Sequence, residues 1–209
     1  FNFNSGTIRI TGNPMLSASF LDKLLGATHT IAAGRILEIG GTPTLTSLLV
    51  LDGGILTVPT LAVGSPLQFE GGTFNLTSDN LTIGTGGLLG STVTLDDRNI
   101  NVTNATTIDS GGQLIFQGGS FFSGGGITNN GQIVVDAPAS AGFLGAVITF
   151  QNPIINNGEL CVSTGAAASF LGGVTGSGSF TGQGTKFFES GSSATVARDD
   201  SRSSASANI

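Results

Sequence analysis

The sequence predicts an all-β protein, a right-handed parallel β-helix (β-solenoid) of about nine or ten coils. Three observations predict it: a segment that recurs along the chain, short runs of alternating apolar and polar residues, and repeated glycine pairs. The alternation alone would also fit an antiparallel sandwich or barrel of hairpins. Solenoid coils present the same inward positions and stay self-similar, whereas sandwich strands diverge in pattern. The recurrence therefore favours the solenoid.

The recurrence is visible at two places. FNFNSGTIRIT at 1–11 is echoed by LQFEGGTFNLT at 67–77, and LLGATHTI at 24–31 is echoed by LLGSTVTL at 88–95. A spacing of about 65 residues corresponds to three coils of roughly 20 to 22 residues each. At a strand spacing of about 4.8 Å, the whole rod would be ~45 Å long.

The strands are predicted from triplets in which two apolar residues flank a residue that points to the opposite side. Glycine pairs such as Gly53-Gly54 and Gly71-Gly72 separate many of these runs and allow tight turns. The triplets are 8–10, 37–39, 49–51, 67–69, 74–76, 81–83, 100–102, 114–116, 133–135 and 160–162.

A segment of the first copy breaks the strand pattern. Its apolar residues fit one face of a helix better than a strand, and they are Met15, Leu16, Phe20, Leu21, Leu24 and Leu25. We therefore expect a short helix near residues 14–25 that plugs or flanks the coils. A bulged loop over an edge of the core fits the same pattern.

The two ends of the chain differ in composition. Residues 1–188 keep the strand and glycine pattern and are expected to form one β-solenoid repeat domain. Residues 189–209 lose it and are rich in Ser and Ala, which predicts a C-terminal tail or a linker between subunits.

Two Asn-Asn-Gly turns recur about one coil plus a loop apart, in ITNNGQIVV (127–135) and in IINNGELCV, which ends at Val162. Asn tolerates left-handed backbone angles, and Asn stacked above Asn can form an amide ladder along a solenoid. Ordinary turns are the alternative interpretation. The same register places Cys161 opposite Val134, so the thiol is expected to point away from the core.

These strings carry a resemblance to a known family. GGTFNLTSDNLTIGTGGLLGS, ITNNGQIVV and VTGSGSFTGQGTKFF resemble the autotransporter-associated β-strand repeats. Such repeats occur in autotransporter passenger domains and in bacterial surface proteins of the PEP-CTERM type. The resemblance covers most of residues 1–188. It implies a right-handed parallel β-helix that is secreted or displayed on a bacterial cell surface, with an adhesive or matrix role and no defined catalytic site.

The composition of the chain limits the classes of partner that we expect. Only 10% of residues are charged, the net charge is -6, and no run of 18 apolar residues occurs. Nucleic acid is therefore not expected as a partner, and no membrane span is predicted. The aromatic residues are 14 Phe with no Trp and no Tyr, which supply core volume rather than polar anchors.

No catalytic, cofactor or metal site can be assembled from the sequence, and no cofactor is expected. The acidic pairs are Asp96-Asp97 and Asp199-Asp200, and neighbours in an extended strand point to opposite faces. Arg98 follows the first pair, which is best interpreted as a solvated turn. His29 stands where the other copy has Val93, so it is interpreted as a substituted strand position.

The function favoured by this pattern is structural. The chain begins in the repeat pattern at Phe1 with no cap before it, and uncapped solenoid ends can stack head to tail into open fibres. We expect a homopolymer, a bacterial surface filament or matrix, with extracellular polysaccharide as a further partner. The expected interface residues are Phe1, Phe3, Ile8, Ile10, Phe187 and Phe188. The alternatives are a monomeric adhesin or glycan-binding module, and a polysaccharide-degrading β-helix enzyme that depends on Asp96 or Asp97.

Overall fold

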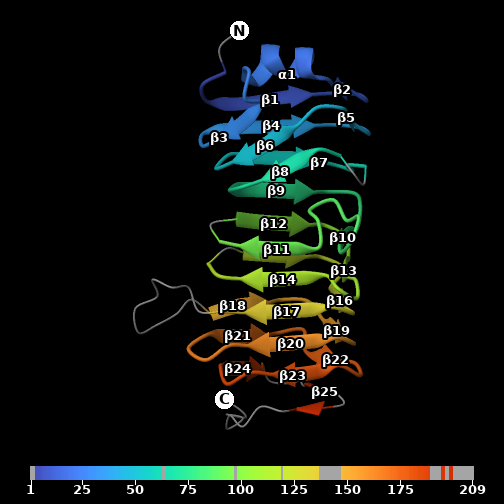
Figure 1. Cartoon of the computed structure of the whole chain (residues 1–209), viewed down its shortest axis with the longest axis vertical. Helices are drawn as coiled ribbons and strands as arrows, with labels where there is room; N and C mark the ends of the chain where they lie inside the picture. Colours follow the sequence, from blue (N-terminus) through green and yellow to red (C-terminus); the bar gives the residue numbers. More distant parts are fainter. Residues whose placement is uncertain are drawn as a thin grey trace.

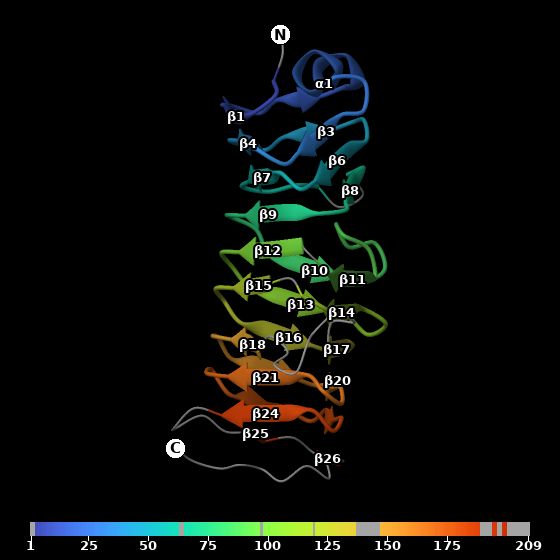
Figure 2. The same ribbon diagram turned by 90° about the vertical axis from the view of Figure 1, so that its left-hand side faces the viewer.

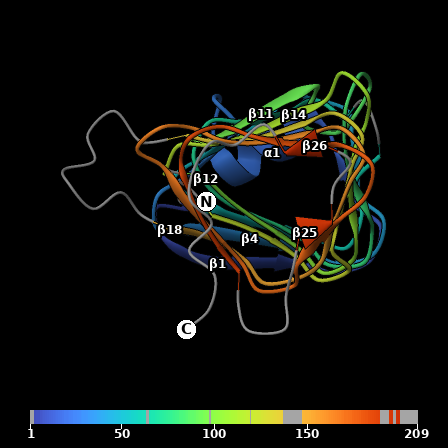
Figure 3. The ribbon, with the colours of Figure 1, turned by 90° about the horizontal axis from the view of Figure 1, so that it is seen from below.

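The computed structural model describes residues 3–62, 65–96, 98–118, 120–136 and 147–188, and the backbone of 194–195 and 198–199. These residues form mostly strands with one helix, and the strands stack in parallel sheets along a rod (Figure 1). Viewed along the rod, the chain runs around a central space with strands on three sides (Figure 3), and buried apolar side chains fill this space. The all-β class, the parallel stacking and the short helix are thus confirmed.

As the chain winds, it adds strands to three faces, although the turn with β7 and β8 has no strand on face 2 among the described residues. Face 1 holds β1 (Gly6–Ile10), β4 (Arg35–Ile39), β7 (Ile55–Val58), β9 (Gly72–Leu76), β12 (Arg98–Val102), β15 (Ser120–Ser123), β18 (Val147–Phe150), β21 (Ala167–Phe170) and β24 (Thr185–Phe188). Face 2 holds β2 (Met15–Leu16), β5 (Thr44–Leu45), β10 (Leu81–Ile83), β13 (Thr106–Ile108), β16 (Ile127–Asn129), β19 (Ile154–Asn156), β22 (Val174–Thr175) and β25 (Ala194–Thr195). Face 3 holds β3 (Thr30–Ala32), β6 (Leu49–Asp52), β8 (Leu67–Phe69), β11 (Thr92–Leu95), β14 (Gln113–Phe116), β17 (Gln132–Val135), β20 (Glu159–Val162), β23 (Ser179–Thr181) and β26 (Arg198–Asp199).

The hydrogen-bonded sheets do not run unbroken along the faces. Face 1 is a six-stranded sheet from β1 to β15 followed by a three-stranded sheet from β18 to β24 (Figure 2). Face 2 is divided between β5 and β10, and face 3 between β8 and β11. The strand pairs within these sheets are all parallel, as the solenoid prediction requires, and β25 and β26 extend two ladders beyond residue 188.

The repeat of about 65 residues is three steps along face 1. Ile8 pairs with Leu37, Leu37 with Leu56, and Leu56 with Phe74, which is the residue that the echo aligns with Ile8. The length of one step is not the predicted 20 to 22 residues, however. It is 29 residues between Arg9 and Glu38, and 18 between Thr57 and Asn75. The difference arises because segments such as the helix are inserted between strands while the ladder keeps its register.

The helix α1 (Ala18–Leu25) covers one end of the rod (Figures 1 and 2). Leu21 and Leu25 are buried against the core, while Asp22 and Lys23 face outward. Solenoids typically carry such terminal caps with a polar outer side. Of the predicted helical face, Leu16 is buried from β2 instead, and Met15 and Phe20 are exposed.

The inward side chains change character along face 1. We call a file the set of positions that pair from one strand to the next along a face. From β1 to β12, one inward file is aliphatic apart from Phe74, and it contains Ile8, Leu37, Leu56 and Ile100. From β18 onward, a neighbouring inward file is a column of three stacked aromatic rings, Phe150, Phe170 and Phe188. Their ring centroids lie 5.2 and 5.4 Å apart. The change falls at the interruption between β15 and β18.

The Asn-Asn-Gly turns form an amide ladder, which is one of the two interpretations that the sequence left open. Asn129 and Asn156 are both buried, and Nδ2 of Asn129 donates to Oδ1 of Asn156 at 2.7 Å. Nδ2 of Asn157 donates to Oδ1 of Asn130 at 3.0 Å. A Cβ atom on Gly158 would collide with the carbonyl of Gly131, so these stacked turns require glycine. The ladder joins the two coils that carry β15 and β18.

Candidate functional site

The candidate site is the interruption of face 1 between β15 and β18. The coils that carry these strands are paired on the other two faces, where Ile127 lies opposite Ile154 and Val134 opposite Cys161. On face 1, β15 pairs only with β12, and β18 only with β21. Two neighbouring strand edges therefore face each other without a ladder between them, within the part of the chain that the structure describes.

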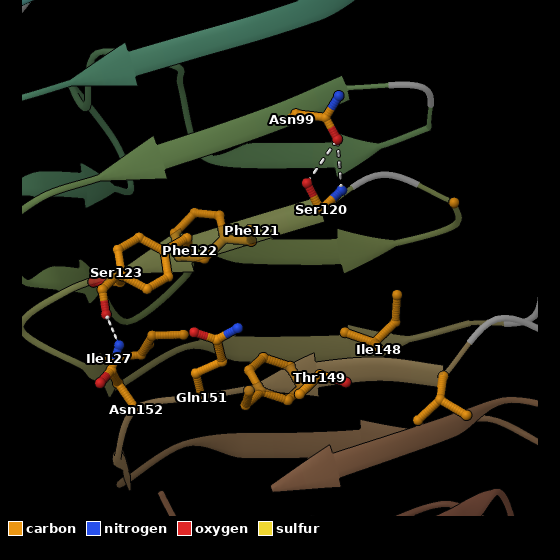
Figure 4. Close-up of a pocket in the computed structure, with 13 residues that line it drawn as sticks. Asn99, Ser120, Phe121, Phe122, Ser123, Ile127, Ile148, Thr149, Gln151 and Asn152 are labelled. Atoms are coloured by element: carbon orange, nitrogen blue, oxygen red, sulfur yellow. Dashed lines mark hydrogen bonds between the residues drawn. The ribbon is translucent and has the colours of Figure 1, made fainter. Parts of the chain in front are cut away.

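A groove of about 450 Å³ occupies this interruption (Figure 4). Its volume lies within the range of about 300–1,000 Å³ that is usual for ligand pockets. The groove is lined by Asn99, Gly118, Ser120, Phe121, Phe122, Ser123, Ile127, Val147, Ile148, Thr149, Phe150, Gln151 and Asn152. None of these residues is charged, so the groove suits an uncharged occupant.

The strands beside the groove bury less than β21, the neighbour of β18 on the same face. In β21 the inward residues Ala168 and Phe170 are buried, and the outward ones are half-buried. At the corresponding inward positions, Phe121 of β15 and Ile148 of β18 are only half-buried. Their outward neighbours Phe122 and Val147 are 40% and 48% exposed. Apolar surface that the ladder would otherwise cover is thus accessible.

The floor of the groove is apolar and part of the core. Phe150 and Ile127 are 5% and 6% exposed. The ring of Phe150 contacts Phe116 edge-on at 5.3 Å and stacks on Phe170 at 5.2 Å. These contacts hold the floor residue Phe150 rigidly in place, so the groove is preformed.

Polar groups lie at the two ends of the groove, and those at one end join its two sides. At one end, Nδ2 of Asn152 donates to the carbonyl of Ser123 at 2.9 Å and joins the two coils. At the other end, Oδ1 of Asn99 accepts from the hydroxyl and backbone N–H of Ser120, at 2.7 and 3.2 Å. Figure 4 shows the strands close together at Ser123 and Asn152 and diverging toward Ser120 and Ile148. The groove is therefore a wedge that is closed at one end.

A second interruption, between β8 and β11 on face 3, is bridged by a side chain. Nε of Arg98 donates to the carbonyl of Glu70 at 3.0 Å, and Nη1 donates to the carbonyl of Thr94 at 3.3 Å. The guanidinium also lies over the ring of Phe69, at 5.8 Å. Arg98 thus has a structural role at this interruption.

The remaining candidate residues for chemistry are dispersed. Asp96 is exposed, whereas Asp97 and Asp200 lie outside the described residues, as does the side chain of Asp199. Residues 3–62, 65–96, 98–118, 120–136 and 147–188 contain no group of three or more His, Cys, Asp or Glu side chains that could hold a metal ion. Cys161 is half-buried between the buried Leu160 and Val162, which confirms its predicted outward direction.

The interpretation of His29 as a strand residue was wrong. His29 precedes β3 and has a positive φ of 49°. Its Nε2 is 3.0 Å from Oδ1 of Asp22, and its Nδ1 is 3.0 Å from the carbonyl of Leu48. The physical reason is that the chain leaves the helical cap at this point, and His29 ties α1 to the coils.

The residues expected at a subunit interface lie at the two ends of the rod. Phe3 is 7% exposed, and Ile8 and Ile10 pack partly buried against the core. Phe188 stacks on Phe170, while Phe187 is 43% exposed. Phe1 lies outside the described residues. The interface itself stays a prediction.

The described surface carries an ion pair on face 1. Arg9 donates to Glu38 on the outward side of face 1 at 2.6 Å. This hydrogen bond, together with the charge of Glu38, raises the pKa of Arg9 above its ordinary value. Arginine is charged in either case, so the shift adds no switch. No helix of the described residues is long and apolar enough to cross a membrane.

The sequence reasoning missed the groove, although one signal marks it. Phe121 and Phe122 are consecutive, and consecutive strand residues point to opposite sides, so one ring has to face outward.

Comparison of the chain with family models, with curated proteins and with solved structures finds no match.

Proposed function

We propose that this chain is a non-enzymatic extracellular binding module, a β-solenoid adhesin of a bacterial surface that holds an uncharged ligand in the β15–β18 groove. One observation carries the proposal: the groove is preformed, uncharged and lined by the exposed rings and methyl groups of Phe122 and Val147. Exposed apolar surface at a concave site is typical of ligand binding. The resemblance to surface β-helix repeats supports the location. Right-handed winding and about nine or ten coils belong to the same proposal.

A binding screen tests this function. The purified chain is presented to arrays of neutral oligosaccharides and neutral peptides, beside the variants Phe122→Ala and Ile155→Ala. Ile155 is a matched control because it is 47% exposed on β19 and does not line the groove. We expect a saturable ligand whose binding is weakened by Phe122→Ala and left unchanged by Ile155→Ala. A full screen with no binding that depends on Phe122 would refute the proposal.

A second candidate is the head-to-tail filament or matrix, in which the chain is its own partner and polysaccharide fills the matrix. The observation that favours it is Phe187, which is 43% exposed on β24. A neighbour stacked on the opposite end would meet α1, whose outer side includes Phe20, and the exposed Met15 of β2. Negative-stain microscopy and sedimentation velocity over a range of concentrations test it. Fibres that disappear in Phe187→Ser would support assembly, and monomers at every concentration would exclude it.

A further inference from the structure

We infer that the ligand of the β15–β18 groove is an extended, uncharged peptide segment that adds a strand to the open edge of face 1. This inference rests on the proposed function and specifies the class of ligand. An exposed strand edge presents a row of backbone N–H and C=O groups, which is a template for another strand. The groove is bordered by two such edges.

Within the described residues, β15 and β18 are each paired on one side only, so their other edges are available. Ile100 of β12 lies opposite Phe121 of β15, and Ile148 of β18 lies opposite Ala168 of β21. The other sides of β15 and β18 face the groove. A peptide that pairs there continues a ladder of face 1 that already runs through six strands on one side and three on the other.

The shape of the groove limits the peptide. The hydrogen bond from Asn152 to Ser123 closes one end, so the segment enters at the wide end beside Ser120 and Val147. Each bordering strand has four residues. At about 3.3 Å per residue, the pairing segment is ~13 Å long. A short stretch of chain fits, and a folded domain does not.

The side chains beside the edges set the pattern of the peptide. Inward side chains of the added strand meet Phe121, Ile127 and Phe150, which favours apolar residues. Outward side chains lie beside Phe122, in the file that carries Thr57, Asn75 and Asn101 on the preceding strands. The lining has no charged group to pair with an ionised ligand, and burying an unpaired charge is costly. The expected segment is therefore neutral, with alternating apolar and small polar residues.

Neutral sugars are the competing class, and the observations favour the peptide. A sugar could stack on a Phe ring and bond the amides of Gln151 and Asn152. It would not pair the rows of backbone groups on β15 and β18, and buried polar groups without partners cost roughly 1–3 kcal/mol each. An added strand pairs the backbone groups of β15 and β18, and it covers the apolar floor of the groove at the same time.

A labelled peptide tests the inference. The probe is GGTFNLTS, the sequence of residues 71–78, which contains the neutral strand β9 of the same face. Its controls are two versions that are N-methylated at alternating positions, a version with Asn replaced by Asp, and a neutral oligosaccharide array. Fluorescence polarisation with the full chain gives the dissociation constants, and circular dichroism checks that the variants fold.

We expect saturable binding of the probe that weakens about tenfold or more in Phe122→Ala and in Val147→Asp, and that is unchanged in Ile155→Ala. At least one N-methylated version should lose binding, because alternate N–H groups of the peptide face β15 and β18. Hydrogen exchange should slow at the amides of β15 or β18 when the probe is bound. If both N-methylated versions bind as tightly as the unmodified probe, strand addition is overturned.

The remaining outcomes separate this inference from the proposed function. If an oligosaccharide binds in a manner that depends on Phe122 and the peptide does not bind, the peptide class is wrong and the binding module stands. If neither class shows binding that depends on Phe122, both are wrong.

Discussion

The interruptions between β8 and β11 and between β15 and β18 both lack a ladder, but a charged side chain bridges the first and an apolar groove occupies the second. In the first, Arg98 donates to backbone carbonyls and lies over Phe69. In the second, the side chain of Asn152 bridges the gap at one end, and the space beside it is open and apolar among the described residues. The difference teaches that a missing ladder is not in itself a site. A gap becomes a site where no side chain fills the space that the missing ladder leaves.

The largest expected effect comes from the aromatic column below the open gap. Phe170 is fully buried, and it contacts Phe150, Phe180 and Phe188. Phe170→Ala should lower the free energy of unfolding by about 3–5 kcal/mol, because it leaves a cavity in the core. Phe187→Ala is the matched control, since this ring is 43% exposed, and it should change stability by less than about 1 kcal/mol. Urea denaturation measures both. Equal effects would show that the column does not hold the lower coils.

The amide ladder on face 2 should rank next, because it clamps the coils on either side of the open gap. Asn156 is buried, accepts from Asn129 and donates to the carbonyl of Ser179 at 2.8 Å. Asn156→Ala should cost about 2–4 kcal/mol, since the buried amide of Asn129 and the half-buried carbonyl of Ser179 each lose a hydrogen bond. Asn157→Ala removes an exposed rung and should cost less than about 0.5 kcal/mol. Thermal unfolding of the two variants compares them, and a similar shift in both would contradict the ladder's role.

Opening the first gap tests the comparison directly. Arg98→Met keeps much of the side-chain volume but removes the donors to Glu70 and Thr94, so we expect a loss of about 2 kcal/mol. Arg9→Met, at an exposed ion pair, should give no measurable change. Hydrogen exchange should also quicken at β8 and β11 in the Arg98 variant. An Arg98 variant as stable as the Arg9 variant would show that the first gap needs no bridge.

The smallest effect concerns the rim of the open gap. Asn75 donates to Thr57 at 2.9 Å, Asn101 donates to Asn75 at 2.9 Å, and Phe122 follows in the same file. Phe122→Asn should add a rung to this ladder and raise stability by about 0.5 kcal/mol or less. The same variant should bind the groove ligand more weakly. A clear loss of stability would mean that the Phe122 ring supports the fold rather than the site.

Much of the fold could be predicted because packing repeats. All ten predicted triplets lie in strands, since Ile8, Leu37 and their equivalents bury the same inward positions in each coil. The amide ladder was predictable for the same reason, as Asn129 and Asn156 occupy one register. The helix was predictable from its pattern around Leu21 and Leu25, but its place as a cap was not, because the sequence led us to expect an uncapped end.

The candidate site could not be predicted, because it depends on an absence of pairing that no single residue encodes. The consecutive Phe121 and Phe122 indicate that one ring faces outward, but they do not indicate an open strand edge, which depends on the positions of β15 and β18 in space. The role of Arg98 was equally hidden, since Glu70 is 28 residues away in sequence. A local pattern identifies the strand but not its neighbour.

The uneven step length has a consequence for how such a molecule can change. A step of 18 residues and one of 29 both connect adjacent strands of one sheet, and each adds a single strand spacing of about 4.8 Å to the rod. The length of the rod therefore depends on the number of turns of the chain and not on the number of residues. Residues inserted between two strands change the cross-section and the surface chemistry of that coil. They leave the distance between the two ends of the rod unchanged.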